Sequence, residues 1–354
     1  MDNGRRVSQT LTFSGKKVDV ILKDYIESMT YTDVASGSSD TLSISLQNIN
    51  GNWLTKWYPK KGNTVSGSII FNDWTEAGVK KKVSCGTFTM DDIKINMAKE
   101  VPPINTHYDV VLHAAGKAHV VPKTEAEKQV FYDVNYQGTV NLCKALENAG
   151  IPKAIVFIST VAVYGCEYGE LITEEHPLEG TSPYADSKIK AERYLAEWCN
   201  THNVKLGILR PSLLAGKNAP GNLGAMVKGI KKGYYMNIAG GKVVKSILMA
   251  EDIARLLPLL EEKGGIYNVC DTRQPSFGEI SESVDRQLGK RKPFSIPYWM
   301  AWCMAKIGDL LGSKAPINSY KLEKMTKSLT FSNEKARREL GWEPLDVLTN
   351  FKID

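Results

Sequence analysis

Tyr184 and Lys188, four residues apart in the segment TSPYADSKIKAE, are the pair of side chains whose chemistry stands out in this sequence. A four-residue spacing places two side chains one above the other on one face of a helix. A phenol titrates at about 10 in water, so it needs help to act as a general acid or base near neutrality. A neighbouring ammonium favours the phenolate and lowers its pKa. The pair therefore predicts proton transfer to or from a hydroxyl, with a lysine that can also hold a ribose.

The spacing by itself does not identify a site, since Tyr320 and Lys324 repeat it and we assign them no role. The segment FISTVAVYG supplies the context, because it puts Ser159 and Thr160 at the end of a predicted buried strand. Ligands of open parallel sheets bind at the carboxyl ends of the strands. Taken alone, Thr160 would be an ordinary β-branched residue whose hydroxyl is hydrogen-bonded at the end of a strand. Beside the tyrosine and the lysine, it predicts a hydroxyl that hydrogen-bonds the phenol and a substrate oxygen.

The elements that must position these residues alternate between strands and helices. YDVVLHAAG, KAIVFIST and VKLGILRPS are apolar runs typical of strands buried on both faces of a parallel sheet. Helical patterns fill the intervals, from Glu125 to Asn148 and from about Pro183 to Asn200. This order predicts an α/β fold with a doubly wound, Rossmann-like parallel sheet. Residues 1–90 instead carry short runs in which the side chains alternate with period two. Gly, Asn, Asp and Ser separate these runs, and the pattern predicts an all-β module.

From about residue 91 the chain resembles the extended short-chain dehydrogenase/reductase family, in its sugar-nucleotide epimerase/dehydratase branch. The segments that carry the resemblance stand in family order and at family spacing: DVVLHAAG, DVNYQGTVNL, FISTVAVYG, SPYADSKIKAE, LGILRPSLLAG, KSILMAEDIA, GGIYNVCD and FSNEKARRELGWEP. The resemblance implies hydride transfer between a bound NAD or NADP and a sugar ring carbon. Tyr184 would be the general acid/base and Lys188 its pKa-lowering, ribose-binding partner. Thr160 would polarise the sugar C4 oxygen and so bind the substrate.

The same resemblance implies further contacts with the cofactor. Asn135 would support the strand that bears Ser159, and a stretch of small residues after the first buried strand would let the cofactor pass close to the backbone. Pro211 would lie beside the nicotinamide carboxamide. The implied cofactor-binding residues are Ala114, Ala115, Gly116, Asn135, Ser159, Tyr184, Lys188 and Pro211.

The substrate-binding part would lie mainly in residues 212–354. Asn222 and Leu223 resemble the family's nucleotide-binding segment, and Lys245 stands where a phosphate-facing basic residue is common. A helix cap for Asn222 and a solvated lysine for Lys245 are the alternatives. Leu213 stands where classical epimerases often carry a substrate-contacting asparagine. The reaction therefore stays open among a sugar-nucleotide epimerase, a dehydratase and a 4-keto-sugar reductase of surface-polysaccharide biosynthesis, and the sugar stays open as well.

The sequence lacks the family's GxxGxxG turn, which joins a first strand to the helix whose N-terminus holds the dinucleotide pyrophosphate. The nearest glycine cluster, Gly216, Gly221 and Gly224, follows the third strand and has another spacing. Without this turn, the pyrophosphate would lose two or three charge-assisted hydrogen bonds, each of roughly 1.5–3 kcal/mol. Their loss would raise the dissociation constant of the cofactor by a factor of about 10² to 10⁶. The strand in YDVVLHAAG would also become a sheet edge. We therefore expect poor dinucleotide binding, and the sequence does not distinguish NAD from NADP.

Residues 1–93 resemble the N-terminal β domain of phage tail or baseplate hub proteins of the late-control type, through D-T-L-x-I-x-L, G-x-W, P-K-K-G-x-x-V and C-G-x-F-x-x-D-D. A generic small β-barrel is the alternative. The two resemblances meet near Asp91–Asn96, which predicts domains of 1–90 and 91–354 and favours a chimeric chain over a genuine fusion. The alternative function is a phage structural protein with an inactive α/β passenger. It would assemble through its β module, whereas the enzyme would act as a homodimer.

The composition of the chain bears on nucleic-acid binding, metal binding, secretion and membrane contact. The 354 residues are 42% hydrophobic and 24% charged with a net charge of +6, and the scattered lysines indicate a solvated surface rather than a nucleic-acid face. Six cysteines lie far apart without CxxC pairs or histidines at metal-ligand spacing, which predicts free thiols in a reducing cytoplasm and no metal site. We see no signal peptide. Ile296–Leu311 is too short to span a bilayer, and we expect it to be a packed amphipathic helix rather than a membrane contact.

Overall fold

The structure, a computed structural model, divides the chain into two compact units, Met1–Asn105 and Thr106–Asp354. It describes residues 6–14, 16–18, 25–32, 40–46, 62–73, 79–90, 97–102, 104, 106–118, 120–217, 219, 221–290, 293–311 and 318–353. The junction expected near Asp91–Asn96 lies outside the described residues.

The described part of the first unit consists of antiparallel strands. One sheet has the order β2-β1-β5-β6, and the other pair is β3-β4. The strands are β1 (Arg6–Phe13), β2 (Lys16–Lys17), β3 (Ile26–Thr32), β4 (Thr41–Leu46), β5 (Thr64–Asn72) and β6 (Lys80–Thr89). Alternate side chains point to opposite faces of a strand, and Leu11, Val65 and Cys85 are the buried apolar residues. The period-two pattern in the sequence reflects this alternation.

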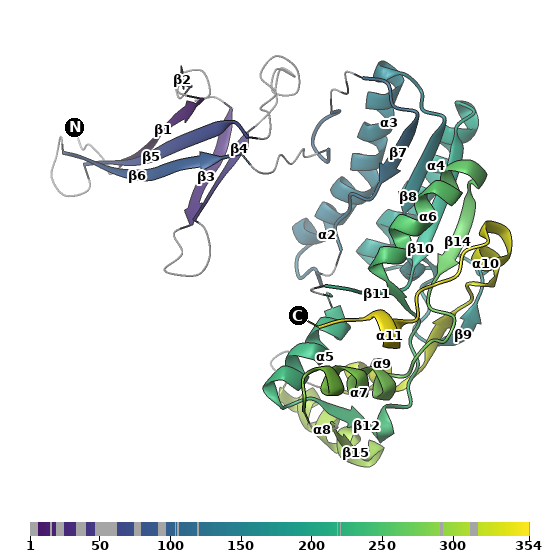
Figure 1. The fold of residues 1–354 in the computed structure, drawn as a ribbon. Coiled ribbons are helices and arrows are strands. Elements are labelled where there is room, and N and C mark those ends of the chain that lie inside the picture. The colour runs from purple at the N-terminus through teal and green to yellow at the C-terminus, as the bar shows by residue number, and fades with distance from the viewer. Residues whose placement is uncertain are drawn as a thin grey trace. The chain divides into compact units, whose positions relative to one another are not determined.

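The second unit is built on a parallel sheet of four strands in the order β14-β10-β8-β7 (Figure 1). These strands are β7 (Val110–His113), β8 (Ala154–Ile158), β10 (Lys205–Pro211) and β14 (Gly265–Val269). The α/β fold with a doubly wound parallel sheet predicted from the sequence is thus confirmed. Ile155, Val156 and Phe157 are buried on both sides of the sheet, which explains why β8 reads as an unbroken apolar run.

Helices cover both faces of this sheet. Arg210 on β10 contacts a side chain of α4 (Pro183–Thr201), whereas Leu209 packs in a cluster with Leu256 of α6 (Ala250–Lys263). Adjacent residues of a strand point to opposite faces, so α4 and α6 lie on opposite sides of the sheet. On the α4 side, α2 (Glu125–Phe131) runs through a π-helical segment, Tyr132–Gln137, into α3 (Gly138–Ala149). The helices expected over 125–148 and 183–200 are both present.

The remaining elements of the second unit follow β10 or connect the sheet. Three further parallel strand pairs, β11-β13, β12-β15 and β16-β9, link distant parts of the chain. The elements are η3 (Val161–Tyr164), β9 (Gly169–Ile172), β11 (Leu213–Ala215), α5 (Gly221–Lys232), β12 (Met236–Ile238), η4 (Ala239–Gly241), β13 (Ile247–Met249), α7 (Phe277–Gln287), β15 (Phe294–Ile296), α8 (Tyr298–Leu311), α9 (Ser319–Thr326), β16 (Leu329–Phe331), α10 (Glu334–Leu340) and α11 (Val347–Asn350). The helix expected near Ile296–Leu311 is α8.

Strand β7 forms one edge of the parallel sheet. In the described part of the chain it pairs with β8 alone. Leu112 in its middle is 47% exposed, an unusual fraction for the centre of an apolar strand. In the strand order of complete doubly wound sheets, the equivalent strand is central.

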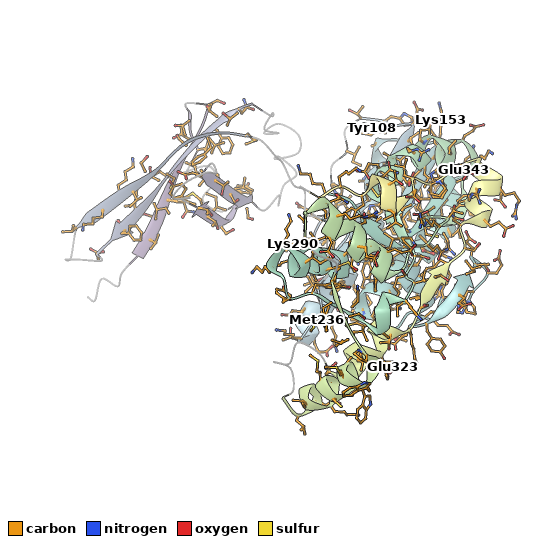
Figure 2. The ribbon with its side chains drawn as sticks, turned by 60° about the horizontal axis from the view of Figure 1, so that its bottom comes forward. Tyr108, Lys153, Met236, Lys290, Glu323 and Glu343 are labelled. Atoms are coloured by element: carbon orange, nitrogen blue, oxygen red, sulfur yellow. The ribbon has the colours of Figure 1, made fainter. Side chains whose placement is uncertain are left out.

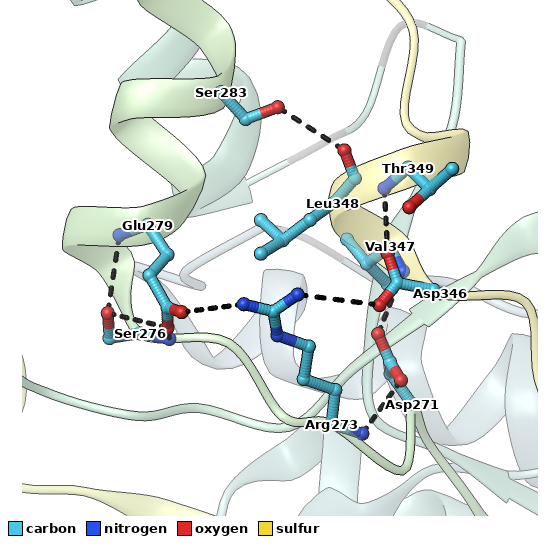
Figure 3. Close-up of polar contacts among 9 residues, drawn as sticks. All are labelled: Asp271, Arg273, Ser276, Glu279, Ser283, Asp346, Val347, Leu348 and Thr349. Carbon is cyan, nitrogen blue, oxygen red and sulfur yellow. Dashed lines mark hydrogen bonds and ion pairs between the residues drawn. The ribbon is translucent and has the colours of Figure 1, made fainter.

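Buried polar contacts attach the C-terminal segment to the body of the second unit (Figure 3). The buried Asp271 carboxylate accepts the backbone N–H groups of Val347, at 2.8 Å, and Arg273, at 2.9 Å. Arg273 in turn pairs with Glu279 at the start of α7, where Ser276 and Glu279 form a capping box. One carboxylate therefore joins the end of β14 to the start of α11.

We predict that Asp271→Ala lowers the free energy of unfolding by about 2–4 kcal/mol, because it leaves two backbone donors without their acceptor near a buried segment. Urea unfolding followed by circular dichroism measures the change. The control is Glu261→Ala, which removes an exposed acidic side chain from α6 and should be nearly neutral. Equal effects of the two substitutions would show that Asp271 does not anchor the segment.

Candidate functional site

Helix α4 presents Tyr184, Lys188 and Glu192 on successive turns. The helix begins where the sequence requires, because the Ser182 hydroxyl accepts the N–H of Ala185 at 3.2 Å and Pro183 occupies the first turn. Side chains four residues apart share one face of a helix, so the three functional groups form one stripe. The stripe faces the end of β8.

Thr160, the second residue after β8, lies beside Tyr184. The Thr160 oxygen accepts the N–H of Ala162 at 3.2 Å, so its own proton stays available at the side of the site where the Tyr184 phenol lies. Burial raises the pKa of Tyr184, and the hydrogen bond from Thr160 offsets this only in part. The expected lowering of the Tyr184 pKa by Lys188 is therefore wrong for this structure. The cost of burying a phenolate decides the direction.

The Lys188 ammonium lies deep in the protein, where it donates to the carbonyl oxygen of Ile158 at 2.9 Å and lies 4.5 Å from the centre of the Phe157 ring. Burial lowers its pKa to about 8, although the charge of Glu192 acts in the opposite direction. A Cβ at Gly116 would come within 3.1 Å of this ammonium, so a larger residue there would press against the lysine. Lys188 is thus held against the carboxyl end of β8.

Asn135 joins the loop after β7 to α4. Its amide nitrogen donates to the Ser187 hydroxyl at 2.9 Å and to the Lys117 carbonyl at 3.1 Å, and its oxygen accepts the Lys117 N–H at 2.7 Å. The expected support for the strand bearing Ser159 is therefore wrong, because these contacts bind the amide to another loop. Asn135 instead fixes the backbone that follows β7.

A buried ion pair lies beneath the site, and we did not predict it from the sequence. Glu192 accepts hydrogen bonds from Nε of Arg210 at 3.1 Å and from its terminal nitrogen at 2.6 Å, and both side chains are buried. The hydroxyl of Ser159 also donates to this carboxylate. The Ser159 proton is therefore used inside the protein, and a contact of this residue with a cofactor would have to use its lone pairs or its backbone.

The network extends to two further elements. Arg210 donates to the Tyr164 hydroxyl at 2.9 Å, and that hydroxyl donates to Asn268 at 2.7 Å. A signal existed in the sequence, since Glu192 continues the four-residue series of Tyr184 and Lys188. Its partner was not recognisable, because a single arginine in an apolar strand does not reveal what it contacts.

His113, at the end of β7, is a second buried group that we did not predict. Its Nε2 lies 2.8 Å from the Thr139 hydroxyl, which itself donates to the carbonyl of Asn135 at 2.7 Å. Since that proton is used, Nε2 must donate to Thr139. Burial, followed by the nearby charge of Lys188, lowers the pKa of His113 to about 3. The imidazole is therefore neutral at physiological pH.

The other predicted residues lie on separate elements. Ala114, Ala115 and Gly116 are exposed after β7, and Pro211 is buried at the end of β10. The Leu223 side chain is buried in an apolar cluster that α5 shares with other elements, so only its backbone is open to the expected nucleotide contact. The side chain of Asn222 lies outside the described residues. Lys245 is half-buried and forms an isolated bridge with Leu329, so it is not the fully solvated lysine of the alternative.

A lysine-rich cavity of about 540 Å³ opens beside α5. Its lining includes the glycine cluster that we noted in the sequence and five basic side chains: Lys217, Lys228, Lys231, Lys232 and Lys352. Such a cavity suits an anionic group. In the described parts of the chain, no three His, Cys, Asp or Glu side chains gather as a metal site requires.

We predict that Arg210→Met lowers the free energy of unfolding by about 3–5 kcal/mol, because it leaves the Glu192 carboxylate buried and unpaired. Adding Glu192→Leu should recover much of the loss, since it removes the orphaned charge. Urea unfolding of both single variants and the double variant gives the coupling energy. The exposed neighbour Arg193 provides the control variant Arg193→Met. A double variant as unstable as the sum of the single variants would contradict this prediction.

We further predict that Lys188 makes stability rise with pH between about 8, its pKa in the folded protein, and 10.5, its ordinary value. In this window the unfolded chain binds more protons than the folded chain, so the free energy of unfolding increases, by up to about 3 kcal/mol. Comparing wild type with Lys188→Met across this range isolates the effect. The exposed Lys190 on the same helix gives the control Lys190→Met. Parallel profiles for wild type and Lys188→Met would contradict the assignment.

Comparisons with known proteins identify the family of the chain. The model of the NAD dependent epimerase/dehydratase family matches residues 73–270, more than half of the chain. A 4-epimerase of N-acetyl-α-D-glucosaminyl-diphospho-ditrans,octacis-undecaprenol from Escherichia coli O157:H7 is 30% identical over 64% of this chain and 70% of its own length. A UDP-glucose 4-epimerase from Vibrio cholerae is 28% identical over 74% of this chain and 79% of its own.

Solved structures show the same fold. A UDP-glucose 4-epimerase from Thermotoga maritima with UDP-glucose has a TM-score of 0.54 at 21% identity, covering 69% of this chain and 75% of that one. A UDP-glucuronic acid 4-epimerase from Bacillus cereus, in complex with UDP-glucuronic acid and NAD, also reaches 0.54, at 18% identity over 69% of this chain and 72% of its own. From the family match and the relatives, the chain belongs to the NAD-dependent epimerase/dehydratase family.

Proposed function

We propose that this chain carries the proton-transfer site of an NAD- or NADP-dependent epimerase, dehydratase or 4-keto-sugar reductase that acts on a sugar joined to a diphosphate. The observation that carries the proposal is that the Tyr184 phenol and the Lys188 ammonium of α4 come together with Thr160 at the carboxyl end of β8. Lys188 lies one turn away on the same face of α4. Ligands of this fold bind at that edge of the sheet.

The raised pKa of Tyr184 sets the direction of its chemistry. Near neutrality the phenol holds its proton, so it acts as a general acid that protonates a substrate oxygen. Thr160 orients the phenol and polarises the same oxygen. This form of the site suits reduction of a keto-sugar. When bound, the nicotinamide supplies or accepts the hydride at the sugar carbon.

The substrate class follows from what the relatives share. The names of the Vibrio cholerae and Escherichia coli enzymes denote sugars joined to a diphosphate, carried by a nucleoside in one and by undecaprenol in the other. The lysine-rich cavity beside α5 has the charge that a diphosphate requires. Lys245 and the start of α5, with Asn222, remain the candidates for the nucleotide contact.

We also propose that the chain binds the dinucleotide weakly. The residues that would hold the nicotinamide half fit the group, because Lys188 lies beside Gly116 at the end of the small, exposed stretch that follows β7. For the phosphate half of the cofactor, the sequence offers no GxxGxxG turn. In the described part of the chain, β7 is an edge strand with Leu112 exposed, as expected where the first strand of the family fold does not pair. The chimeric origin remains our explanation for these features, and a phage tail role remains the alternative.

Ligand binding by the full-length chain tests these proposals. We expect UDP-glucose or UDP-N-acetylglucosamine to raise the melting temperature, because binding to the folded state alone stabilises it. NADH and NADPH fluorescence titrations should give dissociation constants about 10² to 10⁶ weaker than those of complete family members. Tight NAD(P)H binding would overturn the second proposal and leave the first intact. Ring-like oligomers that bind no sugar nucleotide would favour the phage structural role.

At saturating cofactor, Tyr184→Phe should lower turnover at least about 10²-fold and leave the melting shift with UDP-sugar unchanged, because only the transferable proton is removed. Tyr234→Phe, at an exposed tyrosine, is the control. Turnover that is insensitive to Tyr184→Phe would refute the proposed role of the phenol.

A further inference from the structure

Helix α8 buries its small residues and exposes its large apolar ones. Ala301, Ala305 and Gly308 are buried, whereas Trp299 is 66% exposed, Ile307 59% and Leu310 88%. The other exposed large apolar residues of this helix are Tyr298, Met300, Trp302 and Met304. The sequence led us to expect a packed amphipathic helix, but the packed face is the narrow stripe of small residues.

The ordinary arrangement occurs elsewhere in the same unit. Helix α6, of the same length, buries Leu256 and Leu260 and exposes its glutamates. Helices of water-soluble domains follow this second pattern, because burial of large apolar side chains drives their packing. Large apolar groups gathered on a surface indicate an interaction site.

The apolar surface extends beyond the helix itself. The stripe of small residues packs against Leu322 of the neighbouring α9 and against Ile296 of β15. Phe294 on β15 and Met325 on α9 are also exposed. In Figure 1, α8 and β15 lie together at the end of the second unit away from the start of β7. Exposed apolar side chains from three elements therefore occupy this end of the unit.

The charge of the surrounding chain favours an anionic partner. Residues 290–327 contain eight lysines and arginines but only two acidic residues. The helix itself contributes one of each, Lys306 and Asp309, whose charged atoms lie 3.8 Å apart. The helix is thus electrically neutral and apolar, and the excess positive charge belongs to the segments on either side of it.

We propose that α8 and its exposed neighbours dock on the surface of an anionic phospholipid bilayer. Tryptophan, tyrosine and methionine side chains would enter the headgroup region, and the flanking basic residues would attract the anionic lipids. Within the described residues, no helix is long and apolar enough to cross a membrane. The 14 residues of α8 would instead lie along the membrane surface. The docking does not depend on the reaction proposed for the site, so the two can fail separately.

Vesicle flotation of the full-length chain tests this proposal. We expect wild type to float with vesicles of phosphatidylglycerol and phosphatidylethanolamine, more weakly with phosphatidylcholine alone, and less in high salt. The double variant Trp299→Ser/Trp302→Ser should lower the partition coefficient at least about tenfold, because it removes two exposed aromatic anchors. Ile307→Asn should lower it less.

The control is Tyr108→Ser, which removes an exposed aromatic residue from a part of the unit well separated from Glu323 of α9 (Figure 2). It should bind vesicles like wild type, and circular dichroism melts should show that all variants fold. Absence of flotation by wild type, or equal flotation by the double variant, would overturn the proposal. It would also fail if wild type formed oligomers that bind no vesicles and that the double variant disperses, because α8 would then join copies of the chain.

Discussion

The ion pair of Arg210 and Glu192 is the interaction on which the arrangement of the site depends. A guanidinium and a carboxylate are tolerated inside a protein only if hydrogen bonds satisfy them fully. Here the carboxylate receives Ser159 as well as Arg210, and the guanidinium also reaches Tyr164. Because these residues come from α4, the end of β8, β10 and η3, the helix cannot slide along the sheet without exposing an unpaired charge. The position of Tyr184 along the sheet is therefore fixed relative to Thr160.

The exclusion of water that makes loss of either ion-pair partner costly also determines the protonation of the site. Burial favours the neutral form of each titratable group beside it: the pKa of Tyr184 is raised, that of Lys188 is lowered to about 8, and that of His113 is lowered to about 3. Such a site responds strongly to any charge that approaches it, because water screens the interaction poorly. A bound anionic ligand would therefore shift these groups more than it would shift exposed ones.

Two apolar parts of the second unit are exposed in different ways, and each requires a different partner. As far as the described residues show, the outer edge of β7 presents backbone donors and acceptors in the plane of the sheet, so a strand is its complement. The interior backbone groups of α8 are hydrogen-bonded within the helix, and its large apolar side chains are exposed. A non-directional apolar medium suits such a surface, because the hydrophobic effect requires no hydrogen-bond register.

The sequence by itself determined the elements and the pairing of functional groups within them. Unbroken apolar runs predicted the parallel strands, and the four-residue spacing placed Tyr184 and Lys188 on one face of α4, because these periodicities follow from local backbone geometry. The carboxyl-end position of Thr160 followed from the same reasoning. Only the tertiary structure decided that Arg210 meets Glu192, that Asn135 holds the loop after β7, that Leu223 lies in the core and that α8 exposes its tryptophans. It also reversed the expected direction of the Tyr184 pKa. These properties depend on which groups from distant segments exclude water from a side chain, and no local pattern contains that information.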